Sequence, residues 1–161
     1  TRAVLAVLEA HVVNRFCLFG TRPSLAEFSL FGQLSQLGTD PTPQAMMRAD
    51  YPYTYRWLAH IDDMSGHEGE WEPGFAPVVA ELVRLSAEVY APFLAANAAA
   101  AEAGAETLRM EAMGLPYAQG VFKYQLKCLA DLRTRYAALD DAARVAVDLL
   151  LGGDWLALLG G

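Results

Sequence analysis

Apolar residues recur every three or four positions along most of the chain, which is the spacing that places side chains on one face of an α-helix. The first such pattern predicts a helix over residues 3–19, and Gly20 follows as a stop signal. The apolar face of this helix consists of Val4, Leu8, Val12 and Phe16.

A helix-start signal follows at residues 22–32, which read RPSLAEFSLFG. Ser24 is a typical N-cap residue, and Glu27 lies three positions later, where its carboxylate can return a hydrogen bond to the Ser24 amide. This capping box predicts a second helix that runs to about Gly38. Because the following residues are largely apolar, we expect this helix to run through the middle of an all-helical domain.

One side of the second helix carries a polar stripe of Ser29, Gln33 and Gln36 at i, i+4 and i+7. These groups either form internal hydrogen bonds or an exposed strip, or they line a wall of a ligand pocket. The choice matters because a buried amide without a partner costs about 1–3 kcal/mol, whereas pockets use a few such polar groups to orient a ligand.

The remaining chain is also dominated by helical spacing. Pro41 and Pro43 indicate a turn or the start of a short helix. Further helices are predicted over 52–64, where Trp57, Leu58, Ile61 and Met64 share a face, over 75–103 with a kink at Pro92, over 117–138, and from an N-cap at Asp140 to a stop at Gly152. Residues 106–114, ETLRMEAMG, suit either an extended segment or a short helix. The predicted fold class is all-α.

Composition narrows the function classes. The net charge of −7 argues against nucleic-acid binding, which needs clustered cations. The chain has no run of 18 uncharged apolar residues, so we expect no membrane span. The first ten residues have the pattern of an amphipathic helix rather than a signal peptide. We therefore expect a cytoplasmic protein, in which Cys17 and Cys128 are buried thiols rather than a disulfide.

Motifs for common chemistries are missing from the sequence, which has no glycine-rich phosphate loop, CxxC, HExxH or nucleophile elbow. Residues 62–72 carry five acidic residues and no basic one, and the segment reads as a solvated linker. The spacing of its possible metal ligands fits no standard zinc or calcium loop, so we predict no metal site there. Those residues are His60, Asp62, Asp63, His67, Glu68 and Glu70. His11 lies among apolar residues and is interpreted as a core or interface histidine.

Residues 8–64 together resemble the helical C-terminal domain of glutathione S-transferases. In that family a helix leads into a Gly-x-x-Pro-Ser turn, a capping box starts the buried central helix, and a later helix carries a Trp. The matching residues are Gly20, Pro23, Ser24, Glu27, Leu30, Phe31 and Trp57. Glu27 stands where the family usually has Asp, and it still serves as the capping acid.

The resemblance implies a glutathione S-transferase C-terminal-like core over 1–64, an acidic linker over 65–74, and additional helices over 75–161 packed on the same domain. It also implies a homodimer, with glutathione as co-substrate bound mainly by a thioredoxin-like domain outside this chain. We expect residues upstream of Thr1, because the chain does not begin with Met. No catalytic residue is therefore predicted within the chain itself.

In this family the helical domain supplies most of the pocket for a small apolar electrophile. Ser24 and Glu27 then have a structural role, whereas Gln33 and Gln36, toward the far end of the central helix, are the candidates for the pocket. Two alternatives stay open: a non-enzymatic protein-interaction module of the same fold, and a helical bundle that binds an apolar ligand between its helices.

Overall fold

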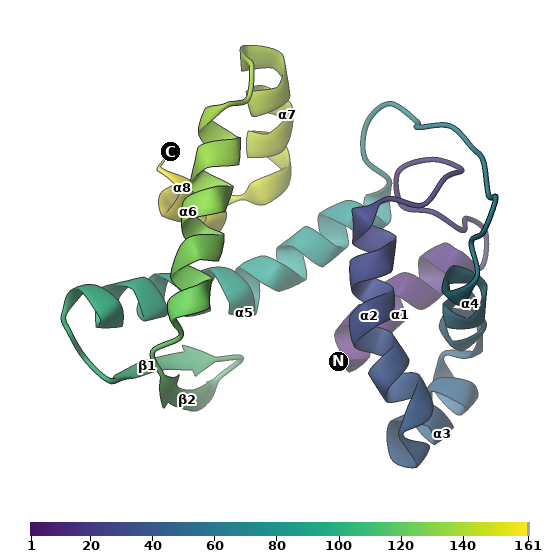
Figure 1. Ribbon diagram of the computed structural model, residues 1–161, viewed down its shortest axis with the longest axis horizontal. Helices are drawn as coiled ribbons and strands as arrows, with labels where there is room; N and C mark the ends of the chain where they lie inside the picture. Colours follow the sequence, from purple (N-terminus) through teal and green to yellow (C-terminus); the bar gives the residue numbers. More distant parts are fainter. Residues whose placement is uncertain (161) are drawn as a thin grey trace. The chain divides into compact units, whose positions relative to one another are not determined.

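A computed structural model describes residues 1–160 of the chain. It divides into two compact units, of which the first is Thr1–Leu82 and the second begins at Val83. Within the described residues the chain forms eight helices and one antiparallel hairpin (Figure 1). The long helix α5, Pro77–Glu102, starts in the first unit and continues past Pro92 in the second.

The first unit is helical. It contains α1 (Arg2–Val12), α2 (Leu25–Thr39), α3 (Pro41–Asp50), α4 (Pro52–Asp62) and the opening turns of α5. Helix α4 packs against the three helices before it. The buried apolar residues of this unit are Leu5, Leu8, Cys17, Leu18, Leu34, Met47, Trp57, Leu58, Ile61, Val78 and Val79. The helix predicted over 52–64 is thus confirmed with a slightly earlier end.

The position of α2 differs from the expectation for a buried central helix. Only Glu27 and Leu34 of this helix are buried, while Leu25 is 85% exposed. In this chain the central place belongs to α4, which contacts α1, α2 and α3. Helix α2 therefore has apolar residues that its neighbours within the unit do not cover.

The first helix is shorter than predicted. Helix α1 ends at Val12 instead of near residue 19. The apolar spacing continues beyond this end because Cys17 and Leu18 are core residues of a loop, where both are buried. A periodic pattern alone does not distinguish such a buried loop from one more turn of helix.

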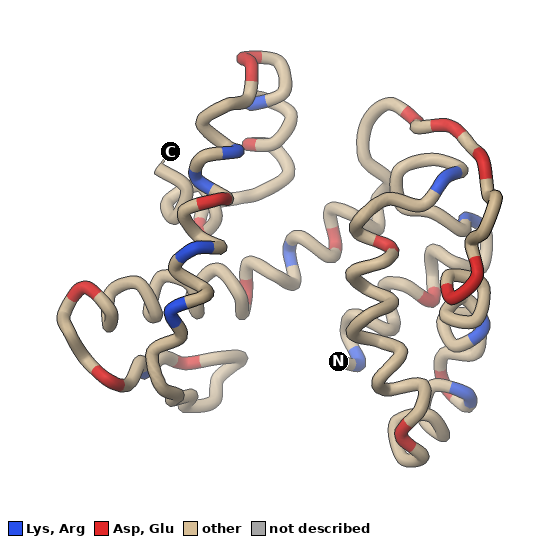
Figure 2. Tube along the Cα trace, in the orientation of Figure 1, with Lys and Arg blue, Asp and Glu red and all other residues tan. Residues whose placement is uncertain are grey.

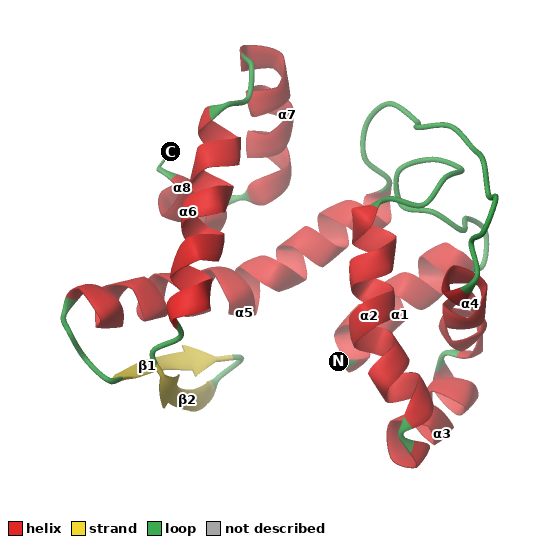
Figure 3. Ribbon diagram, viewed as in Figure 1, coloured by secondary structure: helices red, strands yellow, loops and turns green. Residues whose placement is uncertain are grey.

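The second unit contains the remainder of α5, a hairpin of β1 (Thr107–Ala112) and β2 (Leu115–Gly120), and helices α6 (Lys123–Ala137), α7 (Asp141–Leu151) and α8 (Gly153–Leu159) (Figure 3). Its core consists of Ala91, Leu94, Leu129, Trp155 and Leu158. The predicted N-cap of α7 is confirmed, since the Asp140 carboxylate accepts the Ala143 amide at 2.8 Å, and Gly152 ends the helix.

The hairpin decides one open prediction and corrects another. The ambiguous segment 106–114 contains strand β1, and the helix predicted over 117–138 begins only at Lys123. The two strands are joined by Met113 and Gly114, which have φ angles of 52° and 77°. Two consecutive positive φ angles are typical of the tight turns that connect antiparallel strands. The described residues are therefore mostly helical, in agreement with the predicted helical class, with one small two-stranded sheet in addition.

The acidic segment is bound to the first unit along part of its length. Gly20 and Trp71 form an antiparallel bridge, flanked by hydrogen bonds from Thr21 N–H to Glu70 O at 3.0 Å and from Glu72 N–H to Phe19 O at 2.9 Å. The acidic residues of this segment are exposed, as predicted for a solvated segment; Figure 2 marks their positions along the chain in red. This pairing makes residues 70–72 a fixed part of the first unit.

Gly20 permits this pairing. Its φ of +141° is a conformation that side chains disfavour, and an added Cβ would lie 2.2 Å from Glu70 O. We predict that Gly20→Ala lowers the free energy of unfolding by at least about 2 kcal/mol, through backbone strain and loss of the bridge. Urea unfolding followed by circular dichroism measures this.

The matched control is Gly32→Ala, within α2, where an added Cβ meets no atom within 4 Å. This substitution is expected to stabilise the chain by about 0.5–1 kcal/mol, because alanine favours a helix over glycine. Equal effects of the two substitutions would contradict the role of Gly20.

Candidate functional site

A buried carboxylate organises the start of α2. Glu27 has no exposed surface, and its Oε2 accepts hydrogen bonds from the Ser24 hydroxyl and from the Ser24 amide, the latter at 2.7 Å. The Ser24 hydroxyl oxygen in turn accepts the Ala26 amide at 3.0 Å. The capping box predicted from the sequence is therefore confirmed.

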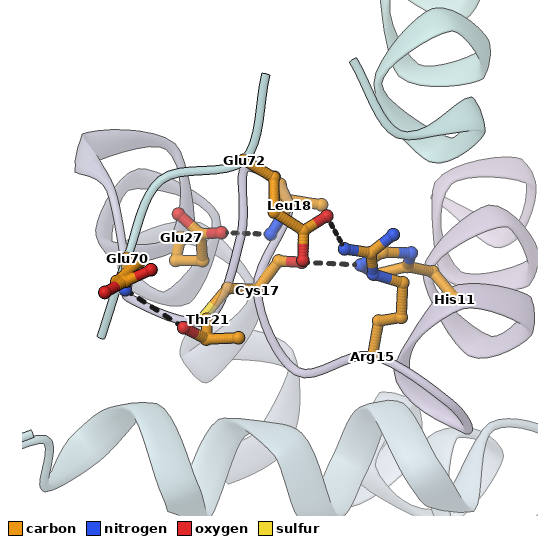
Figure 4. Close-up of polar contacts among 8 residues, drawn as sticks. All are labelled: His11, Arg15, Cys17, Leu18, Thr21, Glu27, Glu70 and Glu72. Atoms are coloured by element: carbon orange, nitrogen blue, oxygen red, sulfur yellow. Dashed lines mark hydrogen bonds and ion pairs between the residues drawn. The ribbon is translucent and has the colours of Figure 1, made fainter. Parts of the chain in front are cut away.

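Glu27 also makes a contact that a capping box does not require. Its other oxygen, Oε1, accepts the amide of Leu18, nine residues earlier in the chain (Figure 4). One buried side chain thus ties the helix start to the preceding loop. A carboxylate that accepts several hydrogen bonds is well satisfied, and its hydrogen-bond donors among residues 1–160 are all uncharged.

Two further contacts hold the loop of residues 13–22. His11 Nε2 lies 3.0 Å from the Cys17 carbonyl (Figure 4), and Trp57 Nε1 donates to the Phe16 carbonyl at 2.9 Å. Trp57, one of the residues that carry the family resemblance, therefore fixes the loop from α4.

The surroundings of His11 lower its pKa, which favours the neutral ring. Burial is the largest cause and Arg15 acts in the same direction, while the bond to the Cys17 carbonyl and the Glu27 carboxylate oppose them. A carbonyl only accepts hydrogen bonds, so the proton of the neutral ring resides on Nε2. His11 is thus a fixed donor at the end of α1.

A groove of about 500 Å³ runs along α1 next to this loop. Small apolar residues form most of its walls, and the polar groups come from His11, Asn14, Arg15 and Glu81. The lining residues are Ala6, Val7, Ala10, His11, Asn14, Arg15, Pro77, Val78 and Glu81. Arg15 also forms an ion pair with Glu72 of the acidic segment (Figure 4). This volume and lining suit a small, largely apolar molecule with a polar group at one end.

The predicted pocket residues lie elsewhere. Gln33 and Gln36 are on α2 outside its buried positions, and neither lines the α1 groove or a second groove of about 580 Å³ between α2 and α4. Ser29 is exposed. In this chain the stripe lies on the outer side of the helix, and its role in an electrophile pocket stays a prediction.

The sequence reasoning missed the α1 groove. Its signal was present as small residues at Ala3, Ala6, Val7 and Ala10, on a different side of the helix from the buried Leu5 and Leu8. A side of small residues leaves room for another molecule beside the helix. The same residues also fit an ordinary amphipathic helix, so the sequence alone does not indicate a groove.

The histidines near the acidic segment pack around a ring. Phe16 lies with its centroid 5.8 Å from that of His60 and 6.5 Å from that of His67, and His67 Nε2 is 2.8 Å from the Thr21 carbonyl. Among residues 1–160, no three His, Cys, Asp or Glu side chains are grouped to hold a metal ion.

Comparison of the chain with protein-family models, with curated proteins and with solved structures finds no match. In the part of the chain that the structure describes, no helix has both the length and the apolar character needed to cross a bilayer.

The contacts around Glu27 predict a graded loss of stability. Ser24→Ala removes the N-cap hydroxyl and should cost about 0.5–2 kcal/mol. Glu27→Ala should cost more, at least about 2–3 kcal/mol, because it leaves the Ser24 and Leu18 amides without their acceptor. Thermal and urea unfolding measure both.

The exposed Glu68 provides the matched control. Glu68→Ala removes the same atoms from a solvated position and should change stability by less than about 0.5 kcal/mol. If Glu27→Ala were as mild as Glu68→Ala, the carboxylate would not hold the loop.

The buried thiol predicts a difference in reactivity. Burial, together with the nearby Glu27 carboxylate, raises the pKa of Cys17 to about 11, whereas Cys128 is half-buried and both thiols are free. At pH 8 only about one Cys17 in a thousand is the reactive thiolate. We expect a disulfide reagent to label Cys128 in the folded chain, and Cys17 only after unfolding.

Single-cysteine chains separate the two thiols. Cys128→Ser should show almost no labelling until denaturant is added, and Cys17→Ser should label at once. Rapid labelling of the folded Cys128→Ser chain would show that Cys17 is accessible.

Proposed function

We propose that the first unit is the helical domain of a glutathione S-transferase-like protein. In a longer chain it would contribute the pocket for an apolar electrophile, while an upstream domain binds glutathione. The observation that carries this proposal is Glu27, which caps the helix at Ser24 and also binds the Leu18 amide inside the unit. The carboxylate thus has the capping role that the resemblance assigns to the family's acid.

The α1 groove offers a suitable environment for an apolar electrophile. Its apolar walls would exclude water from an electrophile, which strengthens electrostatic interactions inside. In conjugation, the glutathione thiolate forms a carbon–sulfur bond, and the leaving group departs with the electron pair of the bond that breaks. The Asn14 amide, which lines the groove, would donate a hydrogen bond to the negative charge that develops.

Exposed apolar residues on α2 support a further neighbour for this helix. Leu25 is 85% exposed and Phe28 46% exposed, and both lie on the helix that also carries Gln33 and Gln36. An upstream domain or a second copy of the chain packed there would bury them and give the two glutamines a pocket to face. The same observation favours the second candidate function, a protein-interaction module without enzymatic activity.

The test uses the natural full-length protein. We expect it to bind glutathione by calorimetry and to conjugate it to 1-chloro-2,4-dinitrobenzene, followed by absorbance. Ala10→Trp fills the α1 groove and should raise KM for this electrophile by at least about tenfold while KM for glutathione is unchanged. Gln33→Ala and Gln36→Ala test the sequence-based candidates. Because neither residue lines the α1 groove, KM for the electrophile should be unchanged if the groove is the pocket, and raised about threefold to tenfold if the electrophile binds beside α2 instead.

Ala49→Trp, at an exposed position of α3, is the control for adding a large ring and should leave both KM values unchanged. A full-length protein that binds no glutathione would overturn the enzymatic proposal and leave the interaction module. Glutathione conjugation that Ala10→Trp does not affect would instead move the electrophile pocket away from α1.

A further inference from the structure

The second unit contains an aromatic pocket that the proposed function does not use. Its volume is about 380 Å³, and α5, both strands of the hairpin and the start of α6 contribute to it. The lining residues are Val89, Tyr90, Phe93, Met110, Ala112, Tyr117, Gln119, Phe122 and Gln125. The family resemblance covers residues 1–64, so the pocket lies outside the part of the chain on which that proposal rests.

Secondary structure brings these side chains to one place. On α5, Val89 and Phe93 are one turn apart and share a face. In the hairpin, alternate residues share a face, so Met110 of β1 lies with its register partner Tyr117 of β2. The hairpin in Figure 3 therefore forms one wall of the pocket and α5 another.

A buried amide fixes the end of the pocket. The Asn97 side chain is fully buried and bonds twice to the backbone of Phe122. Oδ1 accepts the Phe122 amide at 2.8 Å, and Nδ2 donates to the Phe122 carbonyl at 3.1 Å. The Phe122 ring is thus held at the pocket by α5, although it is 48% exposed.

The walls present flat aromatic faces. The rings of Tyr90 and Phe93 are stacked, with centroids 6.3 Å apart and planes 17° apart. Tyr117 meets Phe93 edge to face, with centroids at 6.5 Å. Rings in offset or perpendicular contact are the favourable arrangements, and a further planar ring can extend such a cluster.

The polar groups of the pocket are two carboxamides. The Tyr90 hydroxyl donates to Gln125 Oε1 at 2.8 Å, and the Tyr117 hydroxyl donates to Gln119 Oε1. Each tyrosine therefore occupies the oxygen of one amide. Neither NH2 group has a hydrogen-bond partner among residues 1–160, so both are available to donate to a bound molecule. Burial also raises the pKa of Tyr90, which keeps this hydroxyl a donor.

Charge restricts the ligand further. All of the lining side chains are neutral, and an ion placed among them would lose hydration without gaining a counter-charge. An aliphatic molecule would leave the two amide donors without acceptors. The lining therefore matches a neutral, planar molecule that carries hydrogen-bond acceptors.

We propose that this aromatic pocket binds a neutral, planar aromatic molecule with a carbonyl oxygen. The ring packs against Phe93 and Tyr117, and the carbonyl accepts hydrogen bonds from the amides of Gln119 and Gln125.

Prodan, a neutral naphthalene with a propionyl ketone, is the probe. Its emission shifts to the blue in an apolar site, and we expect saturable binding to the full chain at micromolar concentration. The probe without the ketone, N,N-dimethyl-2-naphthylamine, tests the hydrogen bonds. Gln125→Leu and Gln119→Leu should each weaken prodan by about threefold to tenfold and leave the affinity for the naphthylamine unchanged.

A blocking substitution locates the site. Ala112→Trp should abolish binding of both probes, because Ala112 lines the pocket. Ala118→Trp is the matched control, since Ala118 is exposed, lies outside the lining and stands between Tyr117 and Gln119, so it is on the opposite face of the hairpin. Circular dichroism of each variant checks that the chain is folded, and if Ala112→Trp fails to fold, the two leucine variants decide alone.

Three results would overturn the proposal. Prodan binding that survives Ala112→Trp in a folded chain would place the ligand elsewhere. Equal weakening of both probes by the leucine variants would show that the amides do not recognise the carbonyl. Sedimentation that shows the chain self-associating through the pocket, with association lost in Ala112→Trp but not in Ala118→Trp, would make a second copy the occupant.

Discussion

The first unit depends on a buried carboxylate whose hydrogen-bond donors, among the residues that the structure describes, are all uncharged. The Glu27 carboxylate is stabilised by the Ser24 hydroxyl and by two backbone amides, from Ser24 and Leu18. Such an arrangement exists only when the helix start and the loop are both in place, because a carboxylate deprived of these donors would be too costly to bury. The capping of α2 and the fold of the loop that precedes it therefore depend on each other. His11 and Trp57 hold the same loop by hydrogen bonds to the Cys17 and Phe16 carbonyls.

This coupling explains why the sequence predicted the helix but not the loop. Ser24 and Glu27 interact within one turn, so their spacing alone reveals the capping box. The hydrogen bond from the Leu18 amide joins residues nine positions apart, on either side of a turn of the chain. No spacing of residue types in the sequence reveals it. The apolar spacing through Phe16 extended the prediction of the first helix past its true end at Val12, because a buried loop and a helix both require apolar residues.

The same limit applies to the second unit. Leu108, Met110 and Ala112 alternate with charged residues, a pattern that suits an extended segment, and they lie in β1. The sequence instead predicts a helix from residue 117, within their partner strand β2, because the apolar spacing there continues into that of α6. The decisive information is the turn at Met113 and Gly114 together with pairing across the strands. The aromatic pocket depends on that pairing and could not be predicted without it.

Asn97 holds the ends of α5 and α6 together, and the hairpin of β1 and β2 is inserted between them. We call the joined helices the frame. Its two bonds to the Phe122 backbone join the end of α5 to the start of α6, and the Val121 amide adds a bond to the Glu106 carbonyl at 2.9 Å. The hairpin leaves and returns through this closed base. Because the entropy of closing a loop grows slowly with its length, evolution can lengthen, shorten or replace the hairpin while the helices stay joined. Chains that share this frame would then differ in one wall of the pocket and in the molecules they select.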